Sequence, residues 1–391
     1  MSRLLTIGMN TIRGFANPAF NFLIVIFGVK IFGKNDWASL INVMIWVFFL
    51  TFILGWGNRD HLLREYSKAP GKMYDAFFSN LLSRSLLLPL ALLLFLFFPV
   101  HIALWAVLLV VLTFAYASLS TLIIYYQNFS AQLLAEAAAF IIIFGSVFYF
   151  ETFDLEIFLI VYTIAIVTKL VVLTVQMNFW KEQFSATLSI QEFKSGFPFF
   201  VLGLSGWLMS KVDIYIVDFY LHQSQLAEYQ LLITAFLMLQ ALASYITIPF
   251  TKHIYRVSDK VVQKMKNKLY TAALPLTSFG VFSIWIILEK FVKLGFTYHY
   301  YVLGSLIALP CYFYTLNIME LIKAHKESTI IYISLFGFFI NISLIFLLIE
   351  TYEILGVLIS VCITQWMMLL VYKALKTTAL KTTALKTTAL K

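Results

Sequence analysis

Residues 102–124 read IALWAVLLVVLTFAYASLSTLII, an apolar run without a single charged side chain. A helix needs about 20 mostly apolar residues to cross the hydrocarbon core of a bilayer. Such runs recur along the whole 391-residue chain, in which 61% of residues are hydrophobic and 12% are charged. A soluble domain carries about 25% charged residues. The composition therefore predicts a polytopic membrane protein and excludes a soluble enzyme, a nucleic-acid-binding domain and a disordered scaffold.

The apolar runs predict an all-α fold with about twelve membrane-spanning helices. Backbone groups must be hydrogen-bonded inside the bilayer, and the runs lack the alternation of barrel strands. The expected spans are 8–29, 38–56, 76–98, 102–124, 131–150, 157–178, 197–217, 227–249, 270–288, 299–320, 328–349 and 354–372. Only residues 99–101 separate the third span from the fourth, so we expect a tight helical hairpin there.

The basic residues are divided unequally between the two sides of the membrane. With the N-terminus in the cytoplasm, the cytoplasmic segments hold 21 Lys and Arg residues and the opposite loops hold 4. Because cytoplasmic loops carry the excess of positive charge, this orientation is favoured. An even number of spans then places both termini in the cytoplasm. The basic segment 252–268 is explained by this topology or by contact with anionic lipid heads.

The layout of the chain repeats once. The second and eighth spans both end in basic segments, at 58–72 and 252–268. Six spans return the chain to its starting side, so two parallel six-helix halves are expected around a central cavity. The predicted divisions are an N-terminal half, a cytoplasmic linker, a C-terminal half and a low-complexity Thr-Thr-Ala-Leu-Lys tail without a specific role, at 1–178, 179–196, 197–373 and 374–391.

A polar stripe runs along the first predicted span. Asn10, Arg13, Asn17 and Asn21 are spaced by 3, 4 and 4 residues, which stacks them on one helical face. Such a stripe can line a water-filled cavity. Alternatively, its amides hold neighbouring helices together.

Other charges lie inside later spans, where ionisable groups are expensive and mark functional sites. Arg84 in the third span is expected to face a cavity that receives an anion, with snorkelling to the cytoplasmic surface as the alternative. Glu136 and Lys169 lie nearer the cytoplasmic ends of their spans, where snorkelling or an interface role is expected.

The seventh span carries Ser210, Lys211 and Asp213 near its middle. Lys211 and Asp213 are two residues apart and therefore point to nearly opposite faces of the helix. Each must face water or find a partner on another helix. Lys211 is interpreted as a cation that contacts substrate or ion, or as half of a structural ion pair, and the same two roles are open for Asp213.

Several chemistries are absent from the sequence. It contains no phosphate-binding glycine loop, no His-Glu-x-x-His, no Cys-x-x-Cys and no Gly-x-Ser-x-Gly. The two cysteines, Cys311 and Cys362, both lie in apolar runs and predict neither a disulfide framework nor a metal site. The outer loops are short. We therefore expect no enzyme and no cofactor.

Residues 206–217 read GWLMSKVDIYIV and are followed by a polar turn and then LAEY at 226–229. A mid-helix Asp, a polar loop and an aromatic residue in this order resemble the Wzx-type flippases, or polysaccharide biosynthesis proteins, of the multidrug/oligosaccharidyl-lipid/polysaccharide exporter superfamily. IFGKNDW at 31–37 and the turn Gly55-Trp56-Gly57 are also similar to that family. Glu228 departs from it, because the family usually has glycine there.

The resemblance implies transport of an undecaprenyl-pyrophosphate-linked oligosaccharide across the bacterial inner membrane for a surface polysaccharide such as O-antigen, capsule or exopolysaccharide. A pyrophosphate needs cations, and a sugar needs amides and hydroxyls. The cations available are Arg13, Arg84 and Lys211, and the hydrogen-bonding groups are Asn10, Asn17, Asn21 and Ser210. The expected partners are this substrate, membrane lipids and other polysaccharide-assembly membrane proteins. We expect a monomer that works by alternating access.

Two other functions remain open. One is an H⁺- or Na⁺-coupled exporter of small molecules with the same fold, which would need a cavity rich in carboxylates. The cations inside the spans outnumber the carboxylates, and this favours an anionic substrate. The other is a membrane oligosaccharide polymerase or ligase, which the short outer loops make less favourable.

Overall fold

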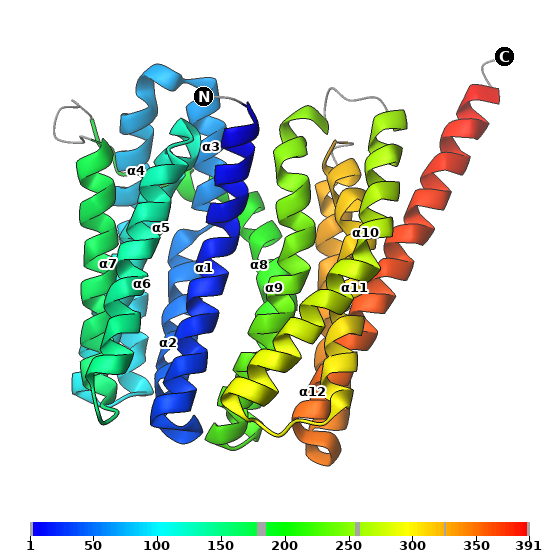
Figure 1. The fold of residues 1–391 in the computed structure, drawn as a ribbon. Helices are drawn as coiled ribbons and strands as arrows, with labels where there is room; N and C mark the ends of the chain where they lie inside the picture. The colour runs from blue at the N-terminus through cyan, green and yellow to red at the C-terminus, as the bar shows by residue number, and fades with distance from the viewer. Residues whose placement is uncertain (1–2, 178–184, 255–258, 324–325, 389–391) are drawn as a thin grey trace. The chain divides into compact units, whose positions relative to one another are not determined.

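The computed structural model describes the backbone of residues 3–177, 185–254, 259–323 and 326–388, and the side chains of residues 14–177, 185–244, 262–321, 326 and 328–375. Within these ranges the chain forms helices and no strand, which confirms the all-α fold (Figure 1). The helices are α1 (Arg3–Phe32), α2 (Lys34–Gly55), α3 (Asn58–Lys68), η1 (Pro70–Lys72), α4 (Met73–Ser85), η2 (Leu88–Leu96), α5 (Val100–Tyr126), α6 (Phe129–Tyr149), α7 (Leu155–Met177), α8 (Ile190–Tyr220), α9 (Gln223–Ile254), α10 (Asp259–Trp285), η4 (Ile286–Val292), α11 (Tyr298–Lys323) and α12 (Glu327–Thr388).

Eleven segments of the described chain are long and apolar enough to cross a membrane. The last of them, Ser328–Leu375, has 48 residues, about twice what one crossing requires. It is bent at Glu353, whose φ of 49° and ψ of −131° are not helical. The two limbs of α12 correspond to the last two predicted spans, so the described residues accommodate the twelve spans expected from the sequence. It is a multi-pass membrane protein.

The third span is not the continuous α-helix that the sequence predicts. α4 ends at Ser85, and η2 continues as a 3₁₀-helix. Pro89 explains the change, because proline cannot donate to the carbonyl four residues before it, which belongs to Ser85. α5 begins at Val100, directly after Pro99, so the expected hairpin is present.

The chain divides into two compact units, residues 1–204 and 205–391, which we call unit 1 and unit 2. The point of division lies inside α8, which begins at Ile190. The stretch 179–196 that the sequence marks as a linker therefore contains the first turns of a helix, while residues 178–184 lie outside the described chain.

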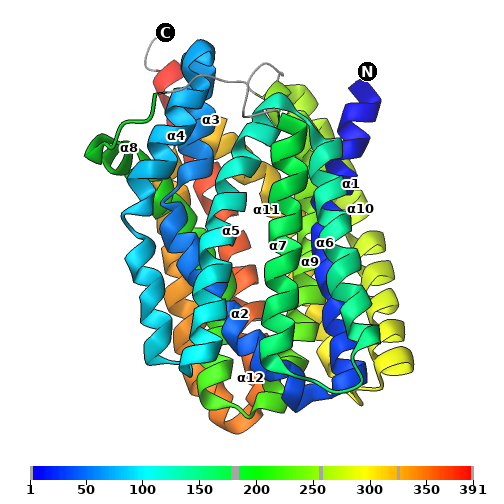
Figure 2. The same cartoon turned by 90° about the vertical axis from the view of Figure 1, so that its left-hand side faces the viewer.

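In unit 1, α7 packs between α5 and α6, while α1 packs on α6 and α2 on α5 (Figure 2). The side chains of α3, α4 and α5 meet α6 and α7 in a buried cluster that includes Leu62, Phe77, Leu122, Ala135 and Leu173. Because these residues come from five helices, the cluster holds α3 and α4 against α5, α6 and α7.

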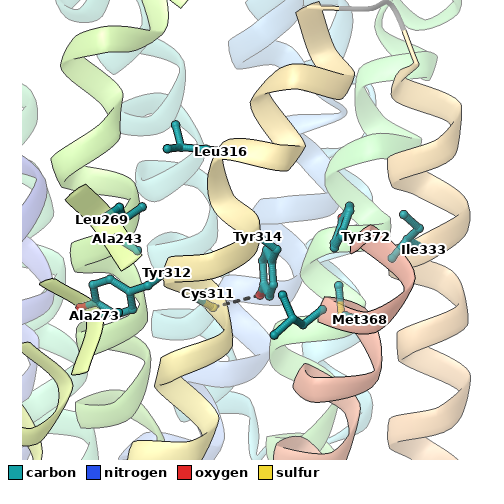
Figure 3. Close-up of a cluster of buried hydrophobic side chains, with 11 residues drawn as sticks. Ala243, Leu269, Ala273, Cys311, Tyr312, Tyr314, Leu316, Ile333, Met368 and Tyr372 are labelled. Carbon is teal, nitrogen blue, oxygen red and sulfur yellow. Dashed lines mark hydrogen bonds between the residues drawn. The ribbon is translucent and has the colours of Figure 1, made fainter. Parts of the chain in front are cut away.

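In unit 2, α11 packs against α9, α10 and α12. Its residues Tyr312, Tyr314 and Leu316 lie in a buried cluster with side chains from the other three helices (Figure 3). The Tyr314 hydroxyl bonds to Gln365 on α12 at 2.7 Å and lies 2.9 Å from the Cys311 sulfur. This polar contact lies inside the apolar core and connects α11 with α12.

A proline inside α11 has its missing hydrogen bond replaced by a side chain. Pro310 leaves the Leu306 carbonyl without its usual helical donor. The indole N–H of Trp366 on α12 donates to that carbonyl at 3.0 Å. The interruption of α11 is thus satisfied by its neighbour, as Pro-containing membrane helices require.

The basic segment 252–268 is mostly helical rather than a loop, because α10 begins at Asp259. Lys266 on this segment is buried, with 1% of its surface exposed. Its ammonium donates to Asn317 at 2.7 Å and to Glu320 at 2.6 Å, both on α11. From the sequence, Lys266 is interpreted as one of the basic residues that set the orientation in the membrane. In the structure it lies in the interior of unit 2.

Candidate functional site

The polar residues of α8 separate onto two faces of the helix, as their spacing predicts. Ser210 and Lys211 are exposed, and Asp213 is buried with 4% of its surface exposed. Lys211 forms no ion pair with any residue that the structure describes. α8 thus carries an exposed lysine in a membrane-spanning segment, and the electrostatic interaction of this lysine is with Asp213 on the same helix.

Asp213 has its own partners inside unit 2. The hydroxyl of Tyr229 on α9 donates to one carboxylate oxygen, and the backbone N–H of Ile214 donates to the other at 3.0 Å. Tyr229 is fully buried. The mid-helix Asp213 and the aromatic Tyr229 that follows it in the sequence are therefore in contact between two consecutive helices. Their spacing in the sequence did not identify this contact.

The stripe on α1 is partly described. Asn17 and Asn21 are exposed, and the amide nitrogen of Asn21 donates to the side-chain oxygen of Asn17 at 3.1 Å. They share a face, as predicted. The side chains of Asn10 and Arg13 lie outside the described residues.

Arg84 is expected to face a cavity, which stays a prediction, and the structure shows its contacts inside unit 1. Its side chain is fully buried in unit 1, and its guanidinium donates to the carbonyl of Gly55, the last residue of α2. Helix C-termini carry partial negative charge and unpaired carbonyls, so a buried cation is stabilised there. Arg84 therefore caps α2, and its remaining nitrogens Nε and Nη2 have no hydrogen-bond partner among the described residues.

The turn that Arg84 caps is shaped by its residues. Trp56 and Gly57 both have positive φ, and a Cβ on Gly57 would overlap the backbone of Phe200 on α8. The Trp56 ring stacks on Phe200 with 4.2 Å between centroids, and its indole donates to the Phe193 carbonyl at 3.1 Å. This packing attaches the first half of α8 to the end of α2.

The segment before α8 is attached to α4 by a regular set of hydrogen bonds. Asp75, Ser79 and Ser83 are four residues apart and therefore share one face of α4. Their side chains accept the backbone N–H groups of residues 185, 187 and 189 at 2.6, 3.0 and 2.9 Å. An extended backbone thus lies along the helix, which we call the strap, residues 185–189. The spacing of the acceptors was visible in the sequence, but their purpose was not.

A carboxylate completes this attachment. Glu192, in the first turn of α8, accepts from Asn80 on α4 at 2.8 Å and lies 3.1 Å from His61 Nε2 on α3. It also interacts electrostatically with Arg84. The strap, α3, α4 and the beginning of α8 are therefore one polar assembly within unit 1.

Glu136 and Lys169 form an ion pair at 2.6 Å between α6 and α7, so of the two expected roles, snorkelling and an interface role, the contact fits the interface. The hydroxyl of Tyr116 on α5 donates to the same carboxylate, and the ammonium lies 5.1 Å from the Tyr116 ring centroid. Three helices that pack together thus neutralise two charges among themselves.

Within the residues that the structure describes, no group of three or more His, Cys, Asp or Glu side chains is placed to hold a metal ion. Cys311 and Cys362 are free and buried.

No family model and no curated protein matches the sequence. Solved structures do. The lipid II flippase MurJ in an inward closed conformation aligns with a TM-score of 0.72 at 17% identity, over 93% of this chain and 86% of that one. A MATE transporter in complex with Br-NRF gives 0.61 at 12% identity, over 97% of each chain. An outward-facing MATE family transporter of the MOP superfamily gives 0.59 at 14% identity, over 98% of each.

The chain has the fold of the MOP-superfamily transporters. These structures confirm the expected fold, and the resemblance to the Wzx-type flippases stays a prediction. One of these structures is named a lipid II flippase and another a multidrug resistance transporter, so the fold alone does not select a substrate.

Proposed function

We propose that this protein is a flippase that moves a lipid-linked, pyrophosphate-bearing oligosaccharide across a bacterial inner membrane. The proposal depends on Lys211, an exposed lysine in mid-span that forms no ion pair in the described chain and interacts electrostatically only with Asp213 among the charges of its own helix. A cation held in that position is expensive unless it meets water or an anion. A diphosphate supplies the anion, and the resemblance to the Wzx-type flippases points to undecaprenyl pyrophosphate as its carrier.

The residues divide the recognition of such a substrate between charge and hydrogen bonding. Lys211 pairs with the pyrophosphate, and the neighbouring Ser210 hydroxyl is exposed beside it. On α1, Asn17 and Asn21 offer exposed amides to sugar hydroxyls, and Asn10 with Arg13 would continue that stripe. Arg84 and Asp213 instead hold helices in place, because both are buried with partners of their own.

Transport then requires no change in covalent bonds. The polyprenyl chain stays in the bilayer while the polar head is released to the opposite leaflet, as alternating access allows. Both termini lie in the cytoplasm in this proposal, the protein acts as a monomer, and it works beside other polysaccharide-assembly membrane proteins. O-antigen, capsule or exopolysaccharide is the class of product that it serves.

The test uses purified protein in vesicles that contain a fluorescent lipid-linked oligosaccharide. Transport is measured as the fraction of label that becomes accessible to an impermeant quencher. We expect Lys211→Ala and Lys211→Gln to abolish transport and Lys211→Arg to retain part of it. Lys326→Ala removes an exposed cation from unit 2 and serves as the control. Wild-type transport by Lys211→Ala would refute the proposal.

A second function is supported by the fold, because MATE transporters align over nearly the whole chain. In that case the protein exports a small molecule in exchange for H⁺ or Na⁺. The same vesicles distinguish the two functions. An imposed ion gradient would drive uptake of a cationic dye, while the lipid-linked sugar would stay in its original leaflet.

A further inference from the structure

α10 has two opposite faces. The inner face carries Lys266, Leu269 and Ala273, which are buried against the rest of unit 2, and Figure 3 shows Leu269 and Ala273 among its core side chains. The outer face carries Lys264 and Lys268, which are exposed and lie one turn apart. The same short segment therefore contains one lysine used for folding and two that are directed away from the core.

The two exposed lysines border a hollow in the surface of α10. This open groove has a volume of about 450 Å³ and is lined by Lys264, Asn267, Lys268, Thr271 and Ala272. Among the described residues neither of its lysines forms an ion pair, whereas Lys266 pairs with Glu320. Two lysines thus line the groove, and none of its lining residues is acidic.

A neutral donor lies between the two lysines. Asn267 accepts a hydrogen bond from Gln263 at 3.1 Å through its side-chain oxygen, and its amide nitrogen donates to no described residue. The Thr271 hydroxyl is already used, because it donates to the backbone carbonyl of Asn267 at 2.9 Å. The groove therefore offers two cations and one amide, a set suited to a phosphate.

Below the groove the same face of α10 becomes apolar. Phe279 and Phe282 follow at helical spacing and are 72% and 56% exposed, and Ile286 in η4 is 41% exposed. From Lys264 to Phe282 the helix rises about 27 Å, close to the thickness of a hydrocarbon core. The charged end of this face matches the headgroup of a lipid, and the exposed aromatic rings along the rest match its acyl chain.

We propose that this face of α10 is a binding site for an anionic membrane lipid. The lipid phosphate lies between Lys264 and Lys268 with the Asn267 amide beside it, and the chain lies along Phe279 and Phe282. The site is independent of the transported substrate, because it uses none of the residues assigned to transport. It also gives the basic segment a specific ligand beyond its topological role.

The experiment measures lipids retained by the purified full-length protein. Phosphatidylglycerol is titrated against it, with phosphatidylcholine and inorganic phosphate as separate probes, and bound lipid is counted by native mass spectrometry. Each lysine near an anionic headgroup strengthens binding about fivefold. We therefore expect about 25-fold weaker phosphatidylglycerol binding in Lys264→Gln/Lys268→Gln and unchanged phosphatidylcholine binding.

Two controls make the result decisive. Lys72→Gln/Lys326→Gln removes two exposed cations from the same predicted side of the membrane and should bind like the wild type. Phe279→Ala/Phe282→Ala should weaken lipid binding without affecting inorganic phosphate. Equal lipid binding by both lysine pairs would overturn the proposal, and so would complete displacement of the lipid by millimolar phosphate. Loss of transport by Lys211 variants leaves this result unaffected, so the two proposals fail separately.

Discussion

Removing the hydroxyl of Tyr229 tests whether Asp213 is a structural residue or part of the transport chemistry. Tyr229→Phe deletes one oxygen and keeps the ring. Tyr229 is fully buried and Asp213 is 4% exposed, so water does not replace the lost donor. The carboxylate keeps the backbone N–H of Ile214, at 3.0 Å, and its electrostatic interaction with Lys211. One oxygen of the buried Asp213 carboxylate then loses its hydroxyl donor.

The magnitude follows from that geometry. A hydrogen bond to a charged group contributes about 1.5–3 kcal/mol, and side-chain hydrogen bonds between membrane helices reach about 1.7 kcal/mol at most. We therefore expect Tyr229→Phe to lower the free energy of unfolding by about 1.5 kcal/mol, where the two ranges overlap. Asp213→Asn should cost less than about 1 kcal/mol, because the amide oxygen still accepts from the Tyr229 hydroxyl.

The assay combines unfolding in mixed detergent micelles with the vesicle transport measurement. Tyr332→Phe removes an exposed hydroxyl from α12 and is the matched control. Asp213→Asn should transport at close to the wild-type rate. An Asp213→Asn variant that folds normally and loses transport would contradict a structural role, since Asp213 would then bind a coupling ion or proton. That outcome would favour the ion-coupled exporter.

Three further predictions concern the other buried polar groups. Glu136→Gln should lower the free energy of unfolding by about 3–5 kcal/mol, because it leaves the Lys169 ammonium buried without its carboxylate, and adding Lys169→Met should restore most of the loss. Trp366→Phe should lower the free energy of unfolding by about 1 kcal/mol in the wild type. In a Pro310→Ala background the loss should be less than half of that, because the alanine N–H supplies the missing donor. A double-mutant cycle measures the difference. Arg84→Leu should reduce the amount of folded, protease-resistant protein, because α2 loses its cap, and normal folding with a specific transport defect would contradict that role.

The helices of this fold could be predicted from the sequence because a bilayer tolerates few alternatives to a long apolar helix. The two limbs of α12 and the start of α5 lie where the apolar runs place them. The change from α4 to η2 was missed, although Pro89 carried the signal. A window of mean hydropathy does not register that one residue lacks an N–H.

The site was less predictable, because burial of a polar residue depends on helices that are distant in sequence. From the sequence alone, Arg84 is interpreted as a functional cation. Its contact with the end of α2 is visible only in the structure. The strap depends on contacts across more than 100 residues of sequence. Only the placement of Lys211 and Asp213 on opposite faces of α8 follows from local spacing, and this prediction agrees with their exposure.

The partners of the charges inside the described spans provide the strongest argument about function. Arg84 has the carbonyl of α2, Glu136 and Lys169 have each other, and Asp213 has the hydroxyl of α9. Each of these groups satisfies, within its own unit, the requirement that a membrane imposes on a charge. Lys211 alone among these five is exposed and without an ion pair in the described chain. A cation that forms no ion pair can bind a ligand that arrives and departs, which is the role that the proposed function assigns to Lys211.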